Sequence, residues 1–337
     1  MRDLITNEVD LIDQMTRPSA SVTEAVSELD GDVLILGVGG KMGPTLAELF
    51  VRAGARRVIG VSRFSDPKVK EYLEKIGVII VQADLLNELE LARLPDASNV
   101  LLLAGFKFGS SANERMMWAM NSWLPGQIMQ RYAGSRVIYI SSGNVYNYTP
   151  IAMGGADEEA EIGPVGEYAQ SRLGGERIAE HLSNRHNIPL LIVRLFYATE
   201  LRYGIIHDLG RKIIDGLPID LCMGHVNQLW QGDANKYLAR SFPLCSSPTT
   251  ILNMAGPDVL SVREIANSMS QQLDREPLFV GKESEAALIG KSGKLFEKLG
   301  RPDISEEQIL EWVVHWISNG GCSLNKPTGY ESRTGRF

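Results

Sequence analysis

The 337-residue chain has few cysteines, and they stand far apart. Only Cys222, Cys245 and Cys322 are present, and no two of them form a C-x-x-C pair. Zinc knuckles and disulfide frameworks need paired spacings, so neither is indicated and a reducing compartment is expected. His207 and His225 have no partner at metal-ligand spacing, and H-E-x-x-H is absent. We therefore expect no metal site.

Long apolar runs and basic clusters are missing as well. No stretch reaches the roughly 18 uncharged apolar residues of a membrane helix, and acidic residues near the start interrupt any signal core. These absences predict a cytoplasmic protein with no membrane partner. The formal net charge is -7, and the longest basic runs are pairs such as Arg56-Arg57. A nucleic-acid groove needs clustered Lys and Arg, so we expect no nucleic-acid partner.

What the sequence does contain is an alternation of short apolar runs with longer amphipathic ones. The apolar runs have the composition of buried parallel strands and cover residues 33–36, 58–61, 78–81, 100–103, 137–140 and 190–193. The helix-like segments between them cover residues 44–53, 67–76, 113–132 and 167–186. Each is long enough for a right-handed crossover. The pattern predicts an α/β fold with a Rossmann-type doubly wound parallel sheet.

A glycine-rich turn follows the first apolar run, with Gly37, Gly40 and Gly43 at intervals of three. Glycines there allow a tight turn, bring backbone amides against a pyrophosphate and seat the next helix closely on the strand. The turn predicts binding of a nicotinamide dinucleotide through Gly37, Gly39, Gly40, Lys41, Met42 and Gly43. An ordinary strand-to-helix turn is the alternative, because such a pattern alone is not specific.

The end of the second expected strand bears on which dinucleotide binds. An NAD-specific protein presents Asp or Glu there to the adenosine ribose, whereas this sequence has Ser62 and then Arg63. A guanidinium at this place, together with Lys41, suits a 2′-phosphate through charge-assisted hydrogen bonds. These residues favour NADP over NAD. The alternative is that Arg63 is a solvated surface residue.

Two further segments carry polar groups at reactive spacing. Ser141 and Ser142 end an apolar run, and Tyr168 and Arg172 lie near the start of an expected helix. Tyr168 and Arg172 are four residues apart and therefore share one helix face. Ser142, at a strand terminus, could meet that face across a bound cofactor.

From about residue 33 to 317 the chain resembles the NAD-dependent epimerase/dehydratase family, the extended branch of the short-chain dehydrogenase/reductase superfamily. The family's Gly-x-x-Gly-x-x-Gly matches residues 37–43, and its Ser-Ser-x-x-Val-Tyr matches residues 141–146. Asp84 matches its adenine-contacting aspartate, Asn121 its helical asparagine, and residues 168–173 its Tyr-x-x-Ser-Lys-Leu. The one failed match is Arg172, which stands where the family has its catalytic lysine.

The resemblance implies a mechanism. Tyrosinate at Tyr168 abstracts a hydroxyl proton while hydride passes to C4 of the nicotinamide, and Ser142 hydrogen-bonds the reacting oxygen. The family's lysine lowers the tyrosine pKa and holds the nicotinamide ribose. Arg172 keeps the positive charge and can donate to ribose hydroxyls, but it stays protonated and cannot relay protons. Further cofactor contacts are expected at Ser62, Arg63, Asp84, Leu85, Ala104, Gly105, Asn121, Tyr168 and Arg172.

The substrate clues lie outside the motifs. Nucleotide-sugar enzymes of the family usually carry arginines in the C-terminal lobe, whereas residues 225–233 here offer amides and a tryptophan. Such groups suit the hydroxyls and apolar ring faces of a sugar. We expect substrate contacts at Lys107, Ser142, Asn144, Tyr197, Asn227 and Trp230. The alternative is that Trp230 packs in the core and Asn227 is a loop residue.

The sequence thus predicts four regions: an N-terminal helical extension (1–31), a dinucleotide-binding Rossmann domain (32–194), a mainly substrate-binding lobe from which a strand could return to the sheet (195–320), and an irregular tail (321–337). The segments 113–132 and 167–186 have surplus apolar faces. Family members often dimerise through these two helices, so we expect a homodimer; a doubly buried core helix is the alternative.

Together these inferences predict an NAD(P)-dependent oxidoreductase or epimerase acting on a secondary hydroxyl of a carbohydrate: a free sugar, a sugar acid or a nucleotide sugar. Epimerase, dehydratase and dehydrogenase differ in whether hydride returns to the substrate, and the sequence does not distinguish them. The replacement at Arg172 motivates an alternative, a catalytically weak cofactor-binding regulator or scaffold.

Overall fold

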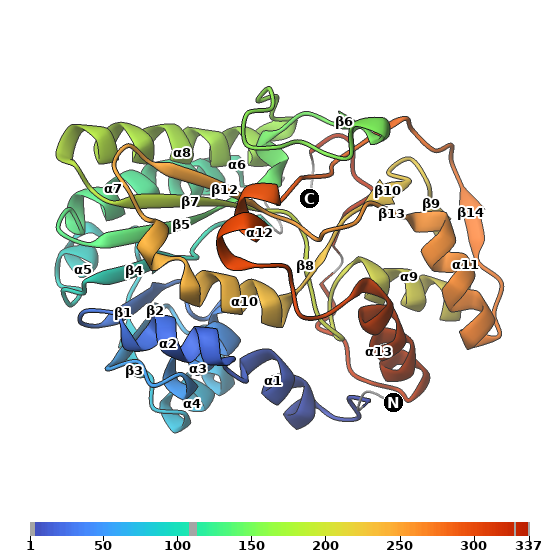
Figure 1. Ribbon diagram of the computed structural model, residues 1–337, viewed down its shortest axis with the longest axis horizontal. Coiled ribbons are helices and arrows are strands. Elements are labelled where there is room, and N and C mark those ends of the chain that lie inside the picture. The colour runs from blue at the N-terminus through green and yellow to red at the C-terminus, as the bar shows by residue number, and fades with distance from the viewer. Residues whose placement is uncertain (1–3, 108–112, 327, 336–337) are drawn as a thin grey trace.

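The computed structural model describes residues 4–107, 113–326 and 328–335. Its centre is a seven-stranded, wholly parallel sheet with the strand order β12-β7-β5-β4-β1-β2-β3 (Figure 1). The strands are β1 (Val33–Leu36), β2 (Val58–Ser62), β3 (Ile79–Gln82), β4 (Asn99–Leu102), β5 (Arg136–Ser142), β7 (Leu190–Leu195) and β12 (Thr250–Met254). This architecture confirms the predicted doubly wound α/β fold, and β12 is a strand that returns to the sheet from the C-terminal half.

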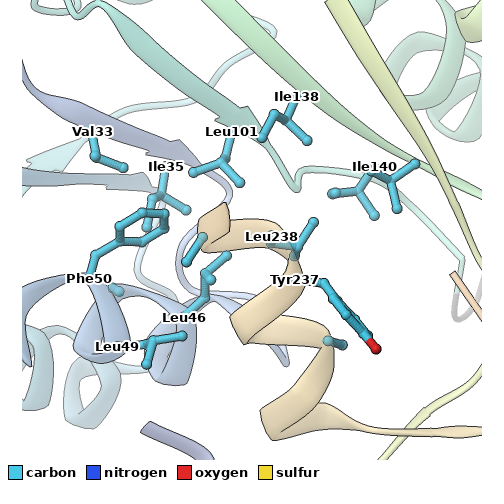
Figure 2. Close-up of a cluster of buried hydrophobic side chains, with 14 of the residues drawn as sticks. Val33, Ile35, Leu46, Leu49, Phe50, Leu101, Ile138, Ile140, Tyr237 and Leu238 are labelled. Atoms are coloured by element: carbon cyan, nitrogen blue, oxygen red, sulfur yellow. The ribbon is translucent and has the colours of Figure 1, made fainter. Parts of the chain in front are cut away.

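Helices cover both faces of the sheet, because alternate residues of each buried strand point to opposite sides. Ile35 and Leu101 face α3 (Gly43–Arg52) and α10 (Gln231–Arg240), whose Phe50 and Leu238 complete the cluster in Figure 2. On the other face lie α7 (Leu124–Arg131) and α8 (Gly166–His186) (Figure 1). α4 (Pro67–Lys75) contacts the edge strand β3, and α5 (Glu88–Ala92) adds Leu91 to the core on the face covered by α7 and α8.

The helix expected over 113–132 is not one regular helix. It consists of α6 (Glu114–Trp118), a π-helical segment η2 (Ala119–Trp123) and then α7. Pro125 lacks the N–H that would bond the carbonyl of Asn121, four residues earlier. That carbonyl accepts a hydrogen bond from the Tyr139 hydroxyl instead, at 3.1 Å. The π-helical segment therefore sits where a buried asparagine is tied to the sheet.

A second core holds the C-terminal lobe, which we define as α9 (Ile205–Ile214), β9 (Pro218–Asp220), α11 (Val262–Leu273), β14 (Leu278–Val280) and α13 (Glu306–Ser318). Several segments after residue 195 belong to the sheet domain and not to this lobe. β12 joins the sheet, and Tyr237 and Leu295, from α10 and α12 (Gly293–Leu299), belong to the sheet's own core. The apolar faces of α10 and α12 pack on the sheet, and β12 pairs with β7. These contacts join residues far apart in the sequence, so local patterns do not indicate them.

The N-terminal helices α1 (Glu8–Thr16) and α2 (Ala20–Ser27) pack against α3 and α10 and bury Leu11, Met15, Val22 and Val26. Ion pairs fix α1 to both parts of the molecule. Asp13 pairs with Arg52 of α3 at 2.7 Å, and Glu8 pairs with Arg202 at 2.7 Å, just before α9. This segment therefore joins the sheet domain to the C-terminal lobe.

The described residues after α13, 319–326 and 328–335, form no helix or strand, yet several of them make contacts across the lobe. Thr328 donates hydrogen bonds to the Asp208 carboxylate from its backbone N–H and its hydroxyl, at 2.8 and 2.7 Å. Tyr330 is buried, and Arg333 donates to the carbonyl of Ala286 at 2.8 Å. Within the described ranges, no helix is both long and apolar enough to cross a membrane.

Candidate active site

The turn between β1 and α3 has a shape that only glycine permits at two positions. Gly37 has φ +89°, and a Cβ there would lie 2.6 Å from the Ala104 nitrogen. A Cβ on Gly43 would overlap the Val38 carbonyl. The backbone of the turn is therefore bare at these positions, and α3 starts without a side-chain cap, so the positive end of its helix dipole is open to an anion.

Two hollows lie on either side of this turn and share Gly37, Gly40 and Leu103. The first, which we call the adenosine-side hollow, lies over β2, β3 and β4. It is lined by Gly39, Ser62, Arg63, Ser65, Ala83, Asp84, Leu85, Ala104, Gly105 and Met120 besides the shared residues. The structure thus gathers Ser62, Arg63, Asp84, Leu85, Ala104 and Gly105 around one space.

The second hollow, which we call the reaction cavity, lies between the carboxyl ends of β4, β5 and β7 and the start of α9. Its polar lining includes Ser142, Asn144, Tyr168, Arg172, Tyr197, Tyr203 and Thr328, with Lys41 and Lys107 as further cations. Ligands of open α/β sheets bind beyond the carboxyl ends of the strands, which is where this cavity lies.

Tyr168 and its neighbours form the chemical centre of the reaction cavity. The Arg172 guanidinium carbon lies 5.5 Å from the centre of the Tyr168 ring, and the Lys107 Nζ lies 5.7 Å from it. Burial by itself raises the pKa of Tyr168, but the charges of Arg172 and Lys107 and hydrogen bonds from Ser142 and Arg172 outweigh it. The pKa of Tyr168 is therefore lowered, as a base working near neutrality requires.

Arg172 is a buried cation fixed by the sheet. Its Nη1 donates to the Ile140 carbonyl at 3.2 Å, and a Cβ on Gly105 would overlap its guanidinium. Its Nε is buried and has no hydrogen-bond partner among the described residues. Burial lowers the pKa of Arg172, but Tyr168 and Tyr139 outweigh this effect and raise the pKa above its ordinary value. The group therefore remains charged and keeps one N–H unused.

Asn121 was expected to contact the cofactor, and its side chain instead organises the loop after β4. Its Oδ1 accepts from the Phe106 N–H at 2.9 Å, and its Nδ2 donates to the Phe106 carbonyl at 3.0 Å. Nδ2 also donates to Ser171 of α8 at 3.0 Å. Asn121 is fully buried and lines neither hollow, so it acts on the site through the loop that carries Lys107.

Behind the cavity lies a buried charged cluster that the sequence did not reveal. Arg194 of β7 donates from Nη2 to Glu176 of α8 at 2.8 Å and from Nη1 to the Tyr146 hydroxyl at 2.7 Å. Ser141 donates to the same carboxylate at 2.5 Å. The side chains of Arg194 and Glu176 are 2% and 0% exposed. This cluster ties α8, which carries Tyr168, to the strands that carry Ser142 and Leu195.

Comparison with known proteins matches residues 33–199 to the model of the NAD dependent epimerase/dehydratase family. The chain belongs to this family. Among curated proteins, the comparison finds no match to this sequence.

Solved structures of epimerases and a dehydratase share the fold. UDP-glucuronic acid 4-epimerase from Bacillus cereus in complex with NAD has a TM-score of 0.71 at 17% identity, over 85% of this chain and 96% of that chain. The dTDP-glucose 4,6-dehydratase from Streptomyces venezuelae, with NAD bound, has a TM-score of 0.73 at 18% identity, over 85% and 96%. A UDP-galactose 4-epimerase has a TM-score of 0.67 at 19% identity, over 86% and 99%.

The residues of this family member fit a nicotinamide dinucleotide. The bare turn at residues 37–43 could hold the pyrophosphate, with one half of the cofactor in each hollow. The unused Nε of Arg172 is a donor for the half in the reaction cavity. Lys41 does not fit its expected place beside a 2′-phosphate, because it lines the reaction cavity instead. Its Nζ donates to the Ala198 carbonyl at 2.6 Å, and burial lowers its pKa to about 7.

Two residues expected to contact the substrate lie away from the reaction cavity. Trp230 is 1% exposed and packs edge-on against Trp312, with ring centres 5.3 Å apart. Asn227 is 1% exposed, and its Nδ2 donates to the carbonyls of Gly290 and Gly256. Neither lines the reaction cavity, because both side chains fill the interior beneath it. Lys107, Ser142, Asn144 and Tyr197 do line it.

Two lining residues had no sequence signal. Tyr203 and Thr328 both face the reaction cavity. Tyr203 lies in an irregular segment before α9, and its ring centre is 3.7 Å from the Lys41 Nζ. Thr328 comes from the tail that the sequence marked only as irregular. No motif of the epimerase/dehydratase family pointed to either, so only the folded chain brings them in.

Proposed function

We propose that the protein is an NAD(P)-dependent oxidoreductase or epimerase that acts on a secondary hydroxyl of a carbohydrate. The observation that carries the proposal is the meeting of Tyr168, Ser142 and Arg172 in one cavity beside the glycine turn. A phenol with a lowered pKa, next to a fixed cation and a hydroxyl donor, is equipped for proton abstraction from an alcohol.

The roles of the three side chains follow from their positions. Tyr168 takes the proton of the substrate hydroxyl, and Ser142 donates a hydrogen bond to the same oxygen. Arg172 stabilises the phenolate by its charge and offers its Nε to a ribose hydroxyl. The bound cofactor supplies the hydride acceptor.

The charge of the reaction cavity bears on which class of carbohydrate it binds. Lys41, Lys107 and Arg172 line it, and no Asp or Glu is among the described lining residues. Part of this positive charge serves the cofactor's phosphates. The remainder favours an anionic carbohydrate, a sugar acid or a nucleotide sugar, over a neutral free sugar.

The test is a screen of sugars, sugar acids and nucleotide sugars against the cofactor-loaded protein, followed by nicotinamide absorbance and by product stereochemistry. The proposal expects one class to react. Binding of neither NAD nor NADP would refute it. Cofactor binding without any turnover across the three classes would favour the cofactor-binding regulator instead.

We further propose a preference for NADP, which Arg63 at the adenosine-side hollow supports. Replacing Arg63 by alanine is expected to weaken NADP about tenfold, the worth of one charge-assisted hydrogen bond at an exposed site. NAD has no 2′-phosphate, so its affinity should stay unchanged and serves as the control. Calorimetric titration of both nucleotides measures the difference. Tighter binding of NAD than of NADP to the unsubstituted protein would contradict the preference.

A homodimer through α6 to α7 and α8 is part of the proposal. Trp118, Trp123 and Ile178 are 39%, 58% and 38% exposed, and Trp123 and Ile178 line one apolar hollow between these helices. Trp123→Glu is expected to convert the dimer to monomer, because it places a charge in the buried centre of the interface. Sedimentation measures the mass. The control, Leu89→Glu, alters an apolar residue that is 70% exposed on α5 and should leave the dimer intact. A monomeric unsubstituted protein would contradict the proposal.

A further inference from the structure

The proposed chemistry leaves a proton on Tyr168 that Arg172 cannot remove. A guanidinium is protonated at all working pH values, and at Arg172 the neighbouring tyrosine oxygens raise the pKa further. After Tyr168 has taken a proton from the substrate, the phenol must pass it on before the next turnover. The inference about the route of this proton rests on the proposed function, because that function requires Tyr168 to return to the phenolate.

The groups facing Tyr168 from the surrounding elements offer few acceptors. Tyr139 of β5, Tyr197 after β7 and Tyr203 before α9 all have a pKa raised by burial, so each keeps its proton near neutrality. Lys41 points its Nζ at the Ala198 carbonyl and the Tyr203 ring. Among the described residues Lys107 is the remaining titratable neighbour, and its Nζ lies 5.7 Å from the Tyr168 ring centre.

The fold fixes the loop that carries Lys107. Asn121 holds both backbone groups of Phe106, the residue immediately before it. Gly105, one residue earlier, lies against the Arg172 guanidinium, where a Cβ would not fit. The loop is therefore held at two consecutive residues, by η2 on one side and by α8 on the other. Lys107 and Arg172 approach the Tyr168 ring at similar distances.

We propose that Lys107 is the proton acceptor of Tyr168 and performs the part of the work that Arg172 cannot. The substrate O–H proton goes to the Tyr168 phenolate while the hydride goes to the cofactor. The Tyr168 O–H then gives this proton to the neutral Lys107 amine, directly or across one water. Tyrosinate and ammonium result, and the ammonium releases the proton to solvent. In the direction of reduction every transfer runs in reverse.

Burial supports this role because it lowers the pKa of Lys107. The charge of Arg172 lowers this pKa further, whereas Tyr168 raises it without cancelling the decrease. An amine must be neutral for part of the time to accept a proton. The two cations thus have complementary roles, since Arg172 supplies permanent charge and Lys107 supplies a site that gains and loses a proton.

The test follows the ionisation of Lys107 and needs neither substrate nor cofactor. Lysine side-chain NMR of the full chain is recorded against pH, and Lys107→Arg identifies the signal by deleting it while keeping the charge. We expect Lys107 to titrate well below the roughly 10.4 of a free lysine and to shift further in Tyr168→Phe. The proposal would be overturned, even if the enzyme is active, by either of two results. Lys107 could titrate at the free-lysine value, or its pKa could be the same in Tyr168→Phe as in the unsubstituted protein.

Ultraviolet titration of tyrosinate provides the matching measurement on Tyr168, read as the difference from Tyr168→Phe in each background. Lys107→Met should raise the Tyr168 pKa by about 1 unit or more, since it removes a nearby cation, whereas Lys107→Arg should not. Lys41→Met removes the other cavity lysine and should leave the Tyr168 pKa nearly unchanged. If Lys41→Met moves the pKa and Lys107→Met does not, the acceptor has been misassigned.

Once the screen supplies a substrate, Lys107→Arg separates a proton acceptor from a fixed charge. The arginine keeps the charge, so KM should change little, but kcat should fall about 100-fold, the scale of a lost acid–base group. The alkaline side of the pH profile should change with it. Full kcat in Lys107→Arg would show that only charge is needed at this position, and the proposal would fail.

Discussion

Tyr168→Phe should abolish nearly all turnover while leaving the fold and cofactor binding intact. The change removes one oxygen from a buried ring on α8, so the packing of the ring is preserved. It also removes the group that takes the substrate proton, and loss of a positioned acid–base group costs about 100-fold to 10,000-fold in rate. No other described phenol of the cavity is a substitute, because the pKa values of Tyr197 and Tyr203 are raised by burial.

The measurement is kcat with the substrate found by the screen, beside nucleotide affinity from calorimetry. Tyr132→Phe is the matched control. Tyr132 is also buried, but its hydroxyl donates to the Pro95 carbonyl at 3.2 Å and lies outside both hollows. Its loss should leave kcat unchanged. If Tyr168→Phe retains kcat within a few-fold, another group performs the proton transfer.

Arg194→Met should cause the largest loss of stability. It deletes the cation that pairs with Glu176 and leaves this carboxylate 0% exposed, with Ser141 as its one remaining hydrogen-bond donor among the described residues. Removing one partner of a buried pair costs about 3–5 kcal/mol in the free energy of unfolding, because the other charge is left uncompensated. The loss should also loosen α8 against β5, and with it the position of Tyr168.

Urea denaturation gives this free energy of unfolding. Two further variants serve as controls. Arg211→Ala breaks an exposed ion pair with Asp215 on α9 and should cost less than about 1 kcal/mol. The double variant Arg194→Met with Glu176→Leu should recover much of the lost stability, since no isolated charge remains. A double variant less stable than Arg194→Met alone would contradict this account of the cost.

The fold could be read from the sequence because its signals are local. The runs at 33–36 and 190–193 are short, apolar and bounded by turns, and such runs form buried strands wherever helices cover both faces. The break at residues 119–123 was harder, although Pro125 was a local clue to it. α10, β12 and α12 belong to the sheet domain because of contacts with residues far away in the sequence. No local sequence pattern encodes such contacts.

In the candidate site, too, some residues could be predicted from local sequence patterns and others could not. Ser142, Tyr168 and Arg172 could be named in advance because each occupies a fixed place at a strand end or on one helix face, and the structure brings them together. Lys41 was placed on the wrong side, because the direction of a long side chain depends on partners such as the Ala198 carbonyl. Asn227 and Trp230 are buried outside the cavity, since polar and aromatic residues near a site can equally fill the interior.

Thr328 has a consequence for how the protein is made. The strands β1 to β5 and β7 lie next to one another in the sheet and can assemble while the rest of the chain is still being synthesised. The wall of the reaction cavity formed by Thr328, and the anchors at Asp208 and Ala286 that hold its segment, require residues 328–335. A nascent chain halted after α13 would therefore carry Tyr168 in a cavity with one wall missing. The proposed catalysis should therefore depend on residues 328–335 being in place.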